Sequence, residues 1–353
     1  MKINKLLSLL LLATILFASC EKDSVDLPKG DYENGVLISG EGSGAGTGSI
    51  SFVSDDFVTS ENLIYKTVNN EELGTFLQSM TFDNDNAYIV VDNQNTVTVA
   101  DRYTFEKLGS INTGLILPRF IAVVGNKGYV TNWGSTSSDT DDFIAVVNLE
   151  TYEVESTISV GNGPERIIEN NGKLYVSHKG AYTTNNVISV IDIDSEEVIE
   201  ITVKDNPDEL FFNNLGELVV LSSGRTIYDT DWSVIGTTLA SISMIDITSL
   251  EITNELVFAE GEQPSLMVFE NGAIYYNIGN SVYVINESAT SLSSTSIVET
   301  EGFLYGLEVE GDNLYTLDAS FSDSSKLNIY SISSGSVSIT KDVAIGASKI
   351  YFN

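Results

Sequence analysis

The residues with the clearest chemical potential lie between positions 161 and 180, where the sequence reads GNGPERIIENNGKLYVSHKG. Glu165 and Arg166 follow a proline there, and His178 is the only histidine in the chain. A histidine can act as a general base beside a serine nucleophile. However, no GxSxG, GxxxxGK[ST] or HExxH motif is present in the sequence. We therefore expect no catalytic residue, and we expect His178 to be a structural residue or a ligand contact.

Metal chemistry has little support in the same sequence. A zinc or iron site needs several nitrogen or sulfur ligands, and the chain has one histidine and one cysteine, Cys20. Acidic clusters at 83–86, 138–143 and 192–197 offer the oxygen ligands that calcium prefers. They also occupy predicted turns, where Asp and Asn are favoured for backbone reasons. We expect no metal site and no resident cofactor, with calcium at these turns as the alternative.

The segment 164–178 is one copy of a repeat. Similar segments with a leading proline lie at 118–132, 207–221 and 264–277, and two copies without the proline lie at 77–91 and 304–317. Each copy contains two short apolar strands around a turn, followed by a polar loop and two further alternating strands. A period near forty residues with four strands per repeat predicts a β-propeller.

The two ends of the chain complete the count. Six repeats are followed by a single first strand at 347–353, and the N-terminal region offers three strands without a first, at 35–40, 48–54 and 62–68. The prediction is an all-β, seven-bladed β-propeller over residues 32–353, with four-stranded antiparallel blades and a last blade closed by N- and C-terminal strands. A tyrosine that recurs in the second strands should fill the space between neighbouring sheets: Tyr88, Tyr129, Tyr175, Tyr275 and Tyr315.

The first strand of each blade should line the central channel, so the two residues after the proline position should form a ring at one mouth. The next residue in each copy is apolar and should pack in the blade: Met80, Ile121, Ile167, Leu210, Met267, Leu307 and Ile350. Loops between second and third strands should rise at the same mouth. The predicted ligand-binding residues of the mouth and these loops are Arg119, Phe120, Trp133, Glu165, Arg166, His178, Tyr182, Asp208, Glu209, Tyr228, Trp232, Tyr305 and Lys349. The alternative is structural: the basic residues form salt bridges with Glu165, Asp208 and Glu209, and the aromatic residues cap blade edges.

Charge limits the partners of such a protein. The chain has 17 basic and 50 acidic residues, a formal net charge of −33. Such a surface repels nucleic acid and anionic membrane surfaces. Hydrophobic residues make up 42% of the chain, which is enough to form a core.

The N-terminal residues predict export. Residues 1–19 carry lysines, an apolar run and small residues, the pattern of a signal peptide. The sequence from Leu16 to Cys20, LFASC, resembles a bacterial lipobox, which implies cleavage before Cys20 and lipid attachment to its thiol. Residues 20–31 read as a polar tether, and EKD at 21–23 resembles the surface-export signals of Bacteroidetes lipoproteins. We therefore expect a lipid-anchored protein of the outer membrane, exposed at the cell surface or facing the periplasm.

The repeat lines, such as GKLYVSH and NVISVIDIDSEEVIEITV, resemble the seven-bladed surface-layer or YncE-like propellers. The N-terminal NGVLISGEGSGAGTGSISFVS and LGTFLQSM more narrowly resemble the DUF5074 lipoproteins of Bacteroidetes. Some relatives capture vitamin B12 for a TonB-dependent transporter. The resemblance implies a non-enzymatic protein that binds a small, corrinoid-like ligand or a protein partner such as the transporter, and that is otherwise monomeric. A propeller hydrolase or quinone-dependent dehydrogenase, and a non-catalytic surface scaffold, are the alternatives.

Overall fold

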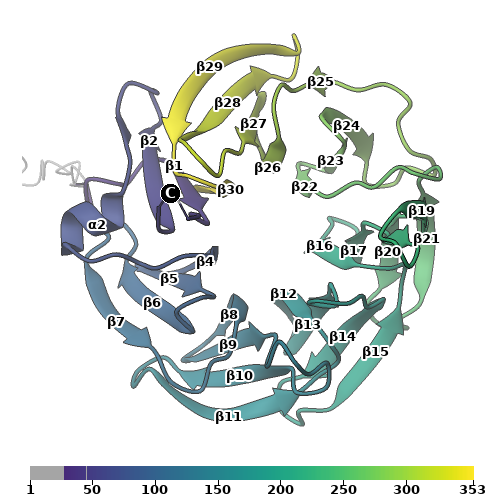
Figure 1. The fold of residues 1–353 in the computed structure, drawn as a ribbon, viewed down its shortest axis with the longest axis horizontal. Helices are drawn as coiled ribbons and strands as arrows, with labels where there is room; N and C mark the ends of the chain where they lie inside the picture. The colour runs from purple at the N-terminus through teal and green to yellow at the C-terminus, as the bar shows by residue number, and fades with distance from the viewer. Residues whose placement is uncertain (1–27, 45) are drawn as a thin grey trace, which may run out of the picture.

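The computed structural model describes residues 28–44 and 46–353. It contains seven four-stranded antiparallel sheets arranged as a ring, with one further two-stranded sheet (Figure 1). This confirms the predicted seven-bladed β-propeller. The predicted signal peptide, Cys20 and most of the predicted tether lie outside the described residues.

Each blade is described from the channel outward. Blade 1 comprises β4 (Leu77–Asp83), β5 (Asn86–Val91), β6 (Thr96–Asp101) and β7 (Lys107–Ile111). Blade 2 comprises β8 (Pro118–Val124), β9 (Lys127–Asn132), β10 (Phe143–Asn148) and β11 (Glu153–Ser159). Blade 3 comprises β12 (Pro164–Asn170), β13 (Lys173–His178), β14 (Val187–Asp192) and β15 (Val198–Thr202). Blade 4 comprises β16 (Pro207–Phe212), β17 (Glu217–Ser222), β20 (Ser241–Asp246) and β21 (Ile252–Val257). Blade 5 comprises β22 (Met267–Glu270), β23 (Ala273–Ile278), β24 (Ser281–Asn286) and β25 (Val298–Glu299). Blade 6 comprises β26 (Leu304–Glu310), β27 (Asn313–Asp318), β28 (Ser325–Ser331) and β29 (Ser336–Val343). Blade 7 comprises β30 (Ala347–Phe352), β1 (Gly35–Gly40), β2 (Ser49–Ser54) and β3 (Ser60–Glu61).

Blade 7 joins the two ends of the chain, as predicted. The innermost strand β30 pairs with β1, with Ile38 opposite Ile350. The predicted strand at 62–68 is wrong, because this segment forms the short helix α2 (Ile64–Asn69) and β3 is only two residues long. Ile64 and Tyr65 are consecutive and both are buried in the core beside blade 1, whereas consecutive residues of a strand point to opposite faces of its sheet.

Neighbouring blades pack through apolar side chains. All five recurrent tyrosines are buried, and all seven residues of the predicted apolar layer are buried. Tyr175, for example, packs edge-on against Phe212 of the next blade, with ring centroids 5.2 Å apart. The repeat therefore places an aromatic residue between sheets, as expected from the sequence.

A β-bulge recurs near the start of the innermost strands. Pro118 pairs with Asn132 and Ile121 with Val130, so Arg119 and Phe120 together lie opposite Thr131. The same irregularity occurs in β4, β12, β16 and β26. A bulge gives two consecutive side chains to the same side of a strand. It explains how two adjacent residues of one blade both reach the channel.

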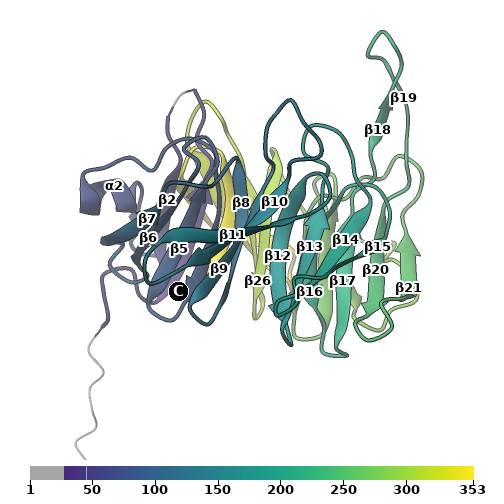
Figure 2. The same cartoon turned by 90° about the horizontal axis from the view of Figure 1, so that it is seen from below.

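The two faces of the ring differ. The innermost strands begin at the face that we call the mouth face, where β13 also ends, because Pro164 pairs with His178. Val36 lies beside Phe352, so β1 begins at the opposite face. The hairpin of β18 (Thr226–Tyr228) and β19 (Val234–Thr237), inserted between β17 and β20, projects from the mouth face (Figure 2). In the described part of the chain, no helix is long and apolar enough to cross a membrane.

Candidate functional site

A cavity of about 300 Å³ opens at the centre of the mouth face. The innermost strands and the loops beside them supply its lining residues. The lining includes seven of the predicted site residues: Arg119, Glu165, Arg166, Asp208, Glu209, Tyr305 and Lys349. The remaining lining residues are Glu41, Gln78, Lys179, Ser265, Leu266, Phe303 and Leu304.

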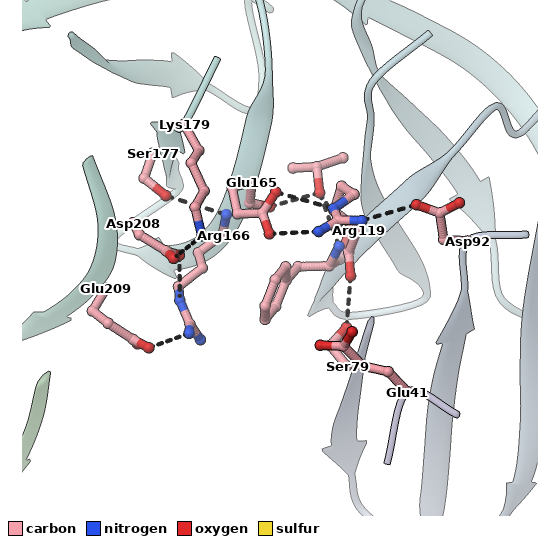
Figure 3. A network of polar contacts seen from close by, with 12 residues as sticks. Glu41, Ser79, Asp92, Arg119, Glu165, Arg166, Ser177, Lys179, Asp208 and Glu209 are labelled. Carbon is pink, nitrogen blue, oxygen red and sulfur yellow. Dashed lines mark hydrogen bonds and ion pairs between the residues drawn. The ribbon is translucent and has the colours of Figure 1, made fainter. Parts of the chain in front are cut away.

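Arg119 forms the first charged cluster of this cavity. Its Nε and one terminal nitrogen donate to the two carboxylate oxygens of Glu165, both at 3.0 Å, and the other terminal nitrogen donates to Asp92 at 2.8 Å (Figure 3). The Trp133 ring covers the guanidinium at 3.9 Å, and Tyr182 packs edge-on against Trp133. A buried arginine held by a bidentate carboxylate and an indole has a fixed orientation.

Arg166 forms the second charged cluster. Its Nε donates to Asp208 at 3.0 Å, a terminal nitrogen donates to Glu209, and the guanidinium lies 4.8 Å from the centre of the Phe120 ring (Figure 3). Lys179 also donates to Asp208, at 2.7 Å. Burial raises the pKa of Asp208, but Lys179 and Arg166 outweigh burial and hold this pKa well below its usual range. Asp208 is therefore ionised at neutral pH.

These contacts favour the structural alternative for two of the three predicted basic residues. Arg119 and Arg166 are paired with Glu165, Asp208 and Glu209, as that alternative requires. Their guanidinium groups form a preorganised wall of the cavity, and a ligand would meet fixed ion pairs there. Lys349 differs, because no ion pair or hydrogen bond of its ammonium group occurs among the residues that the structure describes.

Below the mouth, the channel continues as a second cavity of about 200 Å³, whose lining includes Phe120, Glu308, Lys349 and Tyr351. Burial, and then the nearby Glu209, raise the pKa of Glu308 to about 8. Burial, and then Arg166, lower the pKa of Lys349. Burial in the lower channel thus disfavours the charged forms of Glu308 and Lys349.

The remaining predicted site residues do not line the mouth cavity. Phe120 lines the lower channel, while Trp133 and Tyr182 pack at the rim beside Arg119. His178 is 0% exposed, so the prediction that it contacts a ligand at the loop entrance has no support in the geometry. Its Nδ1–H donates to the Asn162 carbonyl at 3.2 Å and its Nε2 accepts from the Ser189 hydroxyl at 2.8 Å. Burial lowers the pKa of His178 to about 4, which makes it a neutral structural residue.

Tyr228 and Trp232 lie on the β18–β19 hairpin and are absent from the lining of both channel cavities. Trp232 is 81% exposed, and its ring lies 6.2 Å from that of Tyr228. The hairpin projects away from the ring in Figure 2. These two aromatic residues therefore belong to a separate surface.

Sequence reasoning missed Lys179, Glu41 and Glu308. Lys179 directly follows His178 at the end of β13, and Glu41 follows the last residue of β1. Glu308 had the clearest signal, because it is the charged member of a register position otherwise filled by uncharged residues: Thr81, Ala122, Ile168, Phe211, Val268 and Tyr351.

Within residues 28–44 and 46–353, no group of three or more His, Cys, Asp or Glu side chains is arranged so that it could hold a metal ion. Asp192 instead accepts hydrogen bonds from the backbone and hydroxyl of Ser195. This is the usual role of an aspartate that begins a turn.

Comparisons with known proteins identify the family and the fold. A family model described as "Domain of unknown function (DUF5074)" matches residues 34–215. No curated protein matches the chain.

Three solved structures illustrate the likeness of fold. Hydrazine synthase from Kuenenia stuttgartiensis is 19% identical with a TM-score of 0.60, and the match covers 78% of this chain and 91% of that one. Dihydro-heme d1 dehydrogenase NirN in complex with DHE is 13% identical with a TM-score of 0.56, covering 92% and 76%. The computationally designed Ika8 protein is 13% identical with a TM-score of 0.57, covering 92% of each chain. Because the identities are this low, they establish the propeller fold and no activity.

Proposed function

This chain belongs to the DUF5074 family, and we propose that it is a non-catalytic binding protein of the bacterial cell envelope that holds a small polar ligand in its mouth cavity. One observation carries the proposal: blades 2, 3, 4 and 7 direct charged side chains from their innermost strands into one cavity of about 300 Å³. Ligand sites are concave and carry a few polar groups that converge on the ligand.

Stability alone is a weak reason for such an arrangement. Removing two charges from water costs about as much as their mutual attraction returns, and apolar residues of similar volume often replace buried ion pairs without loss. The apolar layer directly below the bulges shows that the same strands can fill their interior with Met, Ile and Leu. Fixed charges around a cavity are instead suited to recognising a polar ligand.

The direction of β1 supports a membrane-anchored orientation. The described chain enters the ring at the face opposite the mouth, where Lys29 pairs with Asp85 of the β4–β5 turn at 3.0 Å. A lipid on Cys20 would therefore attach the protein through that face and leave the mouth directed away from the membrane. Loss of membrane association and of lipid labelling in Cys20→Ala, with the protein still exported, is the expected result.

The mouth face also suits a protein partner such as an outer-membrane transporter. Among the described residues, all six exposed aromatic side chains lie in mouth-face loops: Phe76, Tyr182, Tyr228, Trp232, Phe303 and Phe321. Aromatic residues are enriched in protein interfaces, so a face that carries all of these side chains is a candidate surface for a protein partner. Ligand capture at the centre and partner contact at the rim would then occur on one face.

Calorimetry with the purified protein tests ligand binding. The panel contains α-amino acids, small carboxylates and monosaccharides. It also contains a corrinoid, because some of the relatives that the sequence resembles capture vitamin B12. The variant Ser265→Phe should fill the cavity and abolish binding, whereas Leu215→Ser, on the opposite face, should leave it unchanged. No binding by any panel member, or equal binding by Ser265→Phe, would contradict the proposal. A corrinoid is larger than this cavity, so corrinoid binding that survives Ser265→Phe would place its site on the aromatic rim.

A further inference from the structure

We propose that the mouth cavity selects a small zwitterion of the amino-acid class, whose anionic group binds Lys349 and whose cationic group binds Glu41. This inference rests on the proposed binding function and specifies its ligand. It follows from the pairing of the charged side chains in the cavity, which leaves one cation and one carboxylate without an ionic partner among the described residues.

Four cationic and four carboxylate side chains line the cavity. Three of the four cations, Arg119, Arg166 and Lys179, form ion pairs. These pairs also involve three of the four carboxylates, those of Glu165, Asp208 and Glu209. Within the described residues, Lys349 and Glu41 are the lining charges that remain without an ionic partner.

The carboxylate of Glu41 is positioned by a hydrogen bond and has no cationic partner among the described residues. Its Oε1 accepts a hydrogen bond from the Tyr305 hydroxyl at 3.0 Å. The Tyr305 ring is in turn packed between Phe303, at 5.3 Å between ring centroids, and Phe321, at 5.7 Å. A carboxylate that accepts one neutral donor retains capacity for a cationic donor from a ligand.

Both unpaired groups come from blade 7. Lys349 lies in β30 opposite Ser39 of β1, and Glu41 follows β1 by one residue. The two side chains share the cavity lining but form no ion pair with each other among the described contacts. Because these two opposite charges do not pair with each other, a ligand that carries both a negative and a positive group can bind both of them.

The electrostatics of the whole chain favour a ligand with no net charge. A net charge of −33 repels an anion, although Lys349 needs an anionic partner. Burial, and then Arg166, lower the pKa of Lys349, and the nearby carboxylates of Glu209, Asp208 and Glu41 offset this only in part. An anionic ligand group in direct contact would further stabilise the ammonium form. A zwitterion supplies the anionic group without long-range repulsion, and a cavity of about 300 Å³ is at the small end of ligand sites.

Matched ligands test the proposal on the unmodified protein. The probes are an α-amino acid that binds in the panel, its carboxamide, which lacks the negative charge, and its N-acetyl derivative, which lacks the positive charge. Each derivative should bind at least about tenfold more weakly. Equal affinity of either derivative would overturn the proposal.

Two variants assign each charge to its residue. Lys349→Gln should bind the amino acid and its carboxamide equally, and Glu41→Gln should bind the amino acid and its N-acetyl derivative equally. Lys127→Gln, in an exposed pair outside the cavity, is the control and should keep both preferences. If Lys349→Gln or Glu41→Gln does not fold, the matched ligands still decide the question on the unmodified protein. If other panel members bind while every amino acid fails, the zwitterion proposal falls and the binding function stands; if nothing binds, both fall.

Discussion

The cavity has two sides that treat charge differently. On the side of blades 2 to 4, every charged lining residue belongs to an ion pair within the described chain, and each of the two guanidinium groups is shared by two carboxylates. On the side of blade 7, Lys349 and Glu41 face the same space without ionic partners. The charges on the first side are neutralised by each other, whereas the charges on the second side can still form ion pairs with a ligand.

This difference separates structural charges from charges available for binding. Breaking a buried pair leaves an uncompensated charge in a low-dielectric site, so paired residues should be costly to remove. A buried charge without a partner already carries its desolvation cost in the folded protein, so its removal should be cheap. Stability measurements on the two sides can therefore test the assignment without any ligand.

The largest effect is expected for Arg166→Met on the paired side. The substitution keeps the volume of the side chain but removes both hydrogen bonds to Asp208 and Glu209. We expect the free energy of unfolding to fall by about 3 kcal/mol or more, measured by urea denaturation. Lys179 remains bound to Asp208, so Glu209 carries most of the loss.

Arg225→Met is the matched control for this measurement. Like Arg166, Arg225 pairs with an aspartate through its Nε, here Asp205 at 3.0 Å. This pair lies in an exposed loop and has no second carboxylate among the described residues. Exposed pairs contribute about 0–1 kcal/mol, so the control should change stability by no more than that. Equal losses in the two variants would show that the cavity pairs are not energetically distinct.

The second prediction concerns His178, a buried polar residue of blade 3 whose two nitrogens are both satisfied. Its folded pKa of about 4 lies below the ordinary histidine value of 6.5, so the unfolded state takes up a proton first as the pH falls. Stability should then be lost from pH 6.5 downward, by at most about 1.4 kcal/mol per pH unit from this residue.

Unfolding free energies of wild type and His178→Gln between pH 5 and 7 isolate this contribution. The variant should be less stable at pH 7 but should show a shallower decline with acid. Parallel pH profiles would indicate that His178 takes up its proton at the same pH in the folded and unfolded states, and its assignment as a residue kept neutral by burial would then be wrong.

The fold was predictable because its signals are periodic. The proline before Arg119, Glu165 and Asp208 marks the same position in three blades, and a bulge lies behind it in each. Local sequence therefore determined which residues reach the mouth. It also determined the ring closure, because β30 and β1 to β3 are complementary fragments of one blade.

Contacts between blades could not be predicted in the same way. Arg119 reaches Asp92 of the preceding blade and Glu165 of the following one, and nothing in the local sequence fixes those distances. His178 was expected in a loop, but it pairs with Pro164 as part of β13 and is buried by the chain around Asn162. The segment around Trp232 has a weak alternation, so the sequence predicted a loop at the mouth face and not the hairpin of β18 and β19.

The third prediction tests how the paired side is positioned. Thr131 lies opposite the bulge of β8, where its hydroxyl accepts from the Phe120 N–H at 2.9 Å and donates to the Glu165 carbonyl at 2.8 Å. Thr131→Val keeps the shape and leaves both backbone groups without this partner. We expect a loss of about 1–3 kcal/mol in urea denaturation. Thr253→Val, in the exposed outer strand β21, should cost less than about 0.5 kcal/mol. A loss in Thr131→Val no larger than this would mean that the hydroxyl does not hold the bulge.

The smallest effect is expected for Lys349→Met, on the unpaired side. Lys349 is half-buried in the channel, and burial lowers the pKa of its ammonium group. Removing the charge deletes no ion pair among the described residues, and methionine retains the aliphatic part of the side chain. Urea denaturation should therefore show a change within about 1 kcal/mol of wild type, or a gain in stability. A loss as large as that of Arg166→Met would reveal that Lys349 is a structural counter-charge for Glu209 or Asp208, and the division of the cavity into a paired and an unpaired side would fail. A small change in stability together with loss of ligand binding would show that the protein retains this ammonium for a partner outside its own chain.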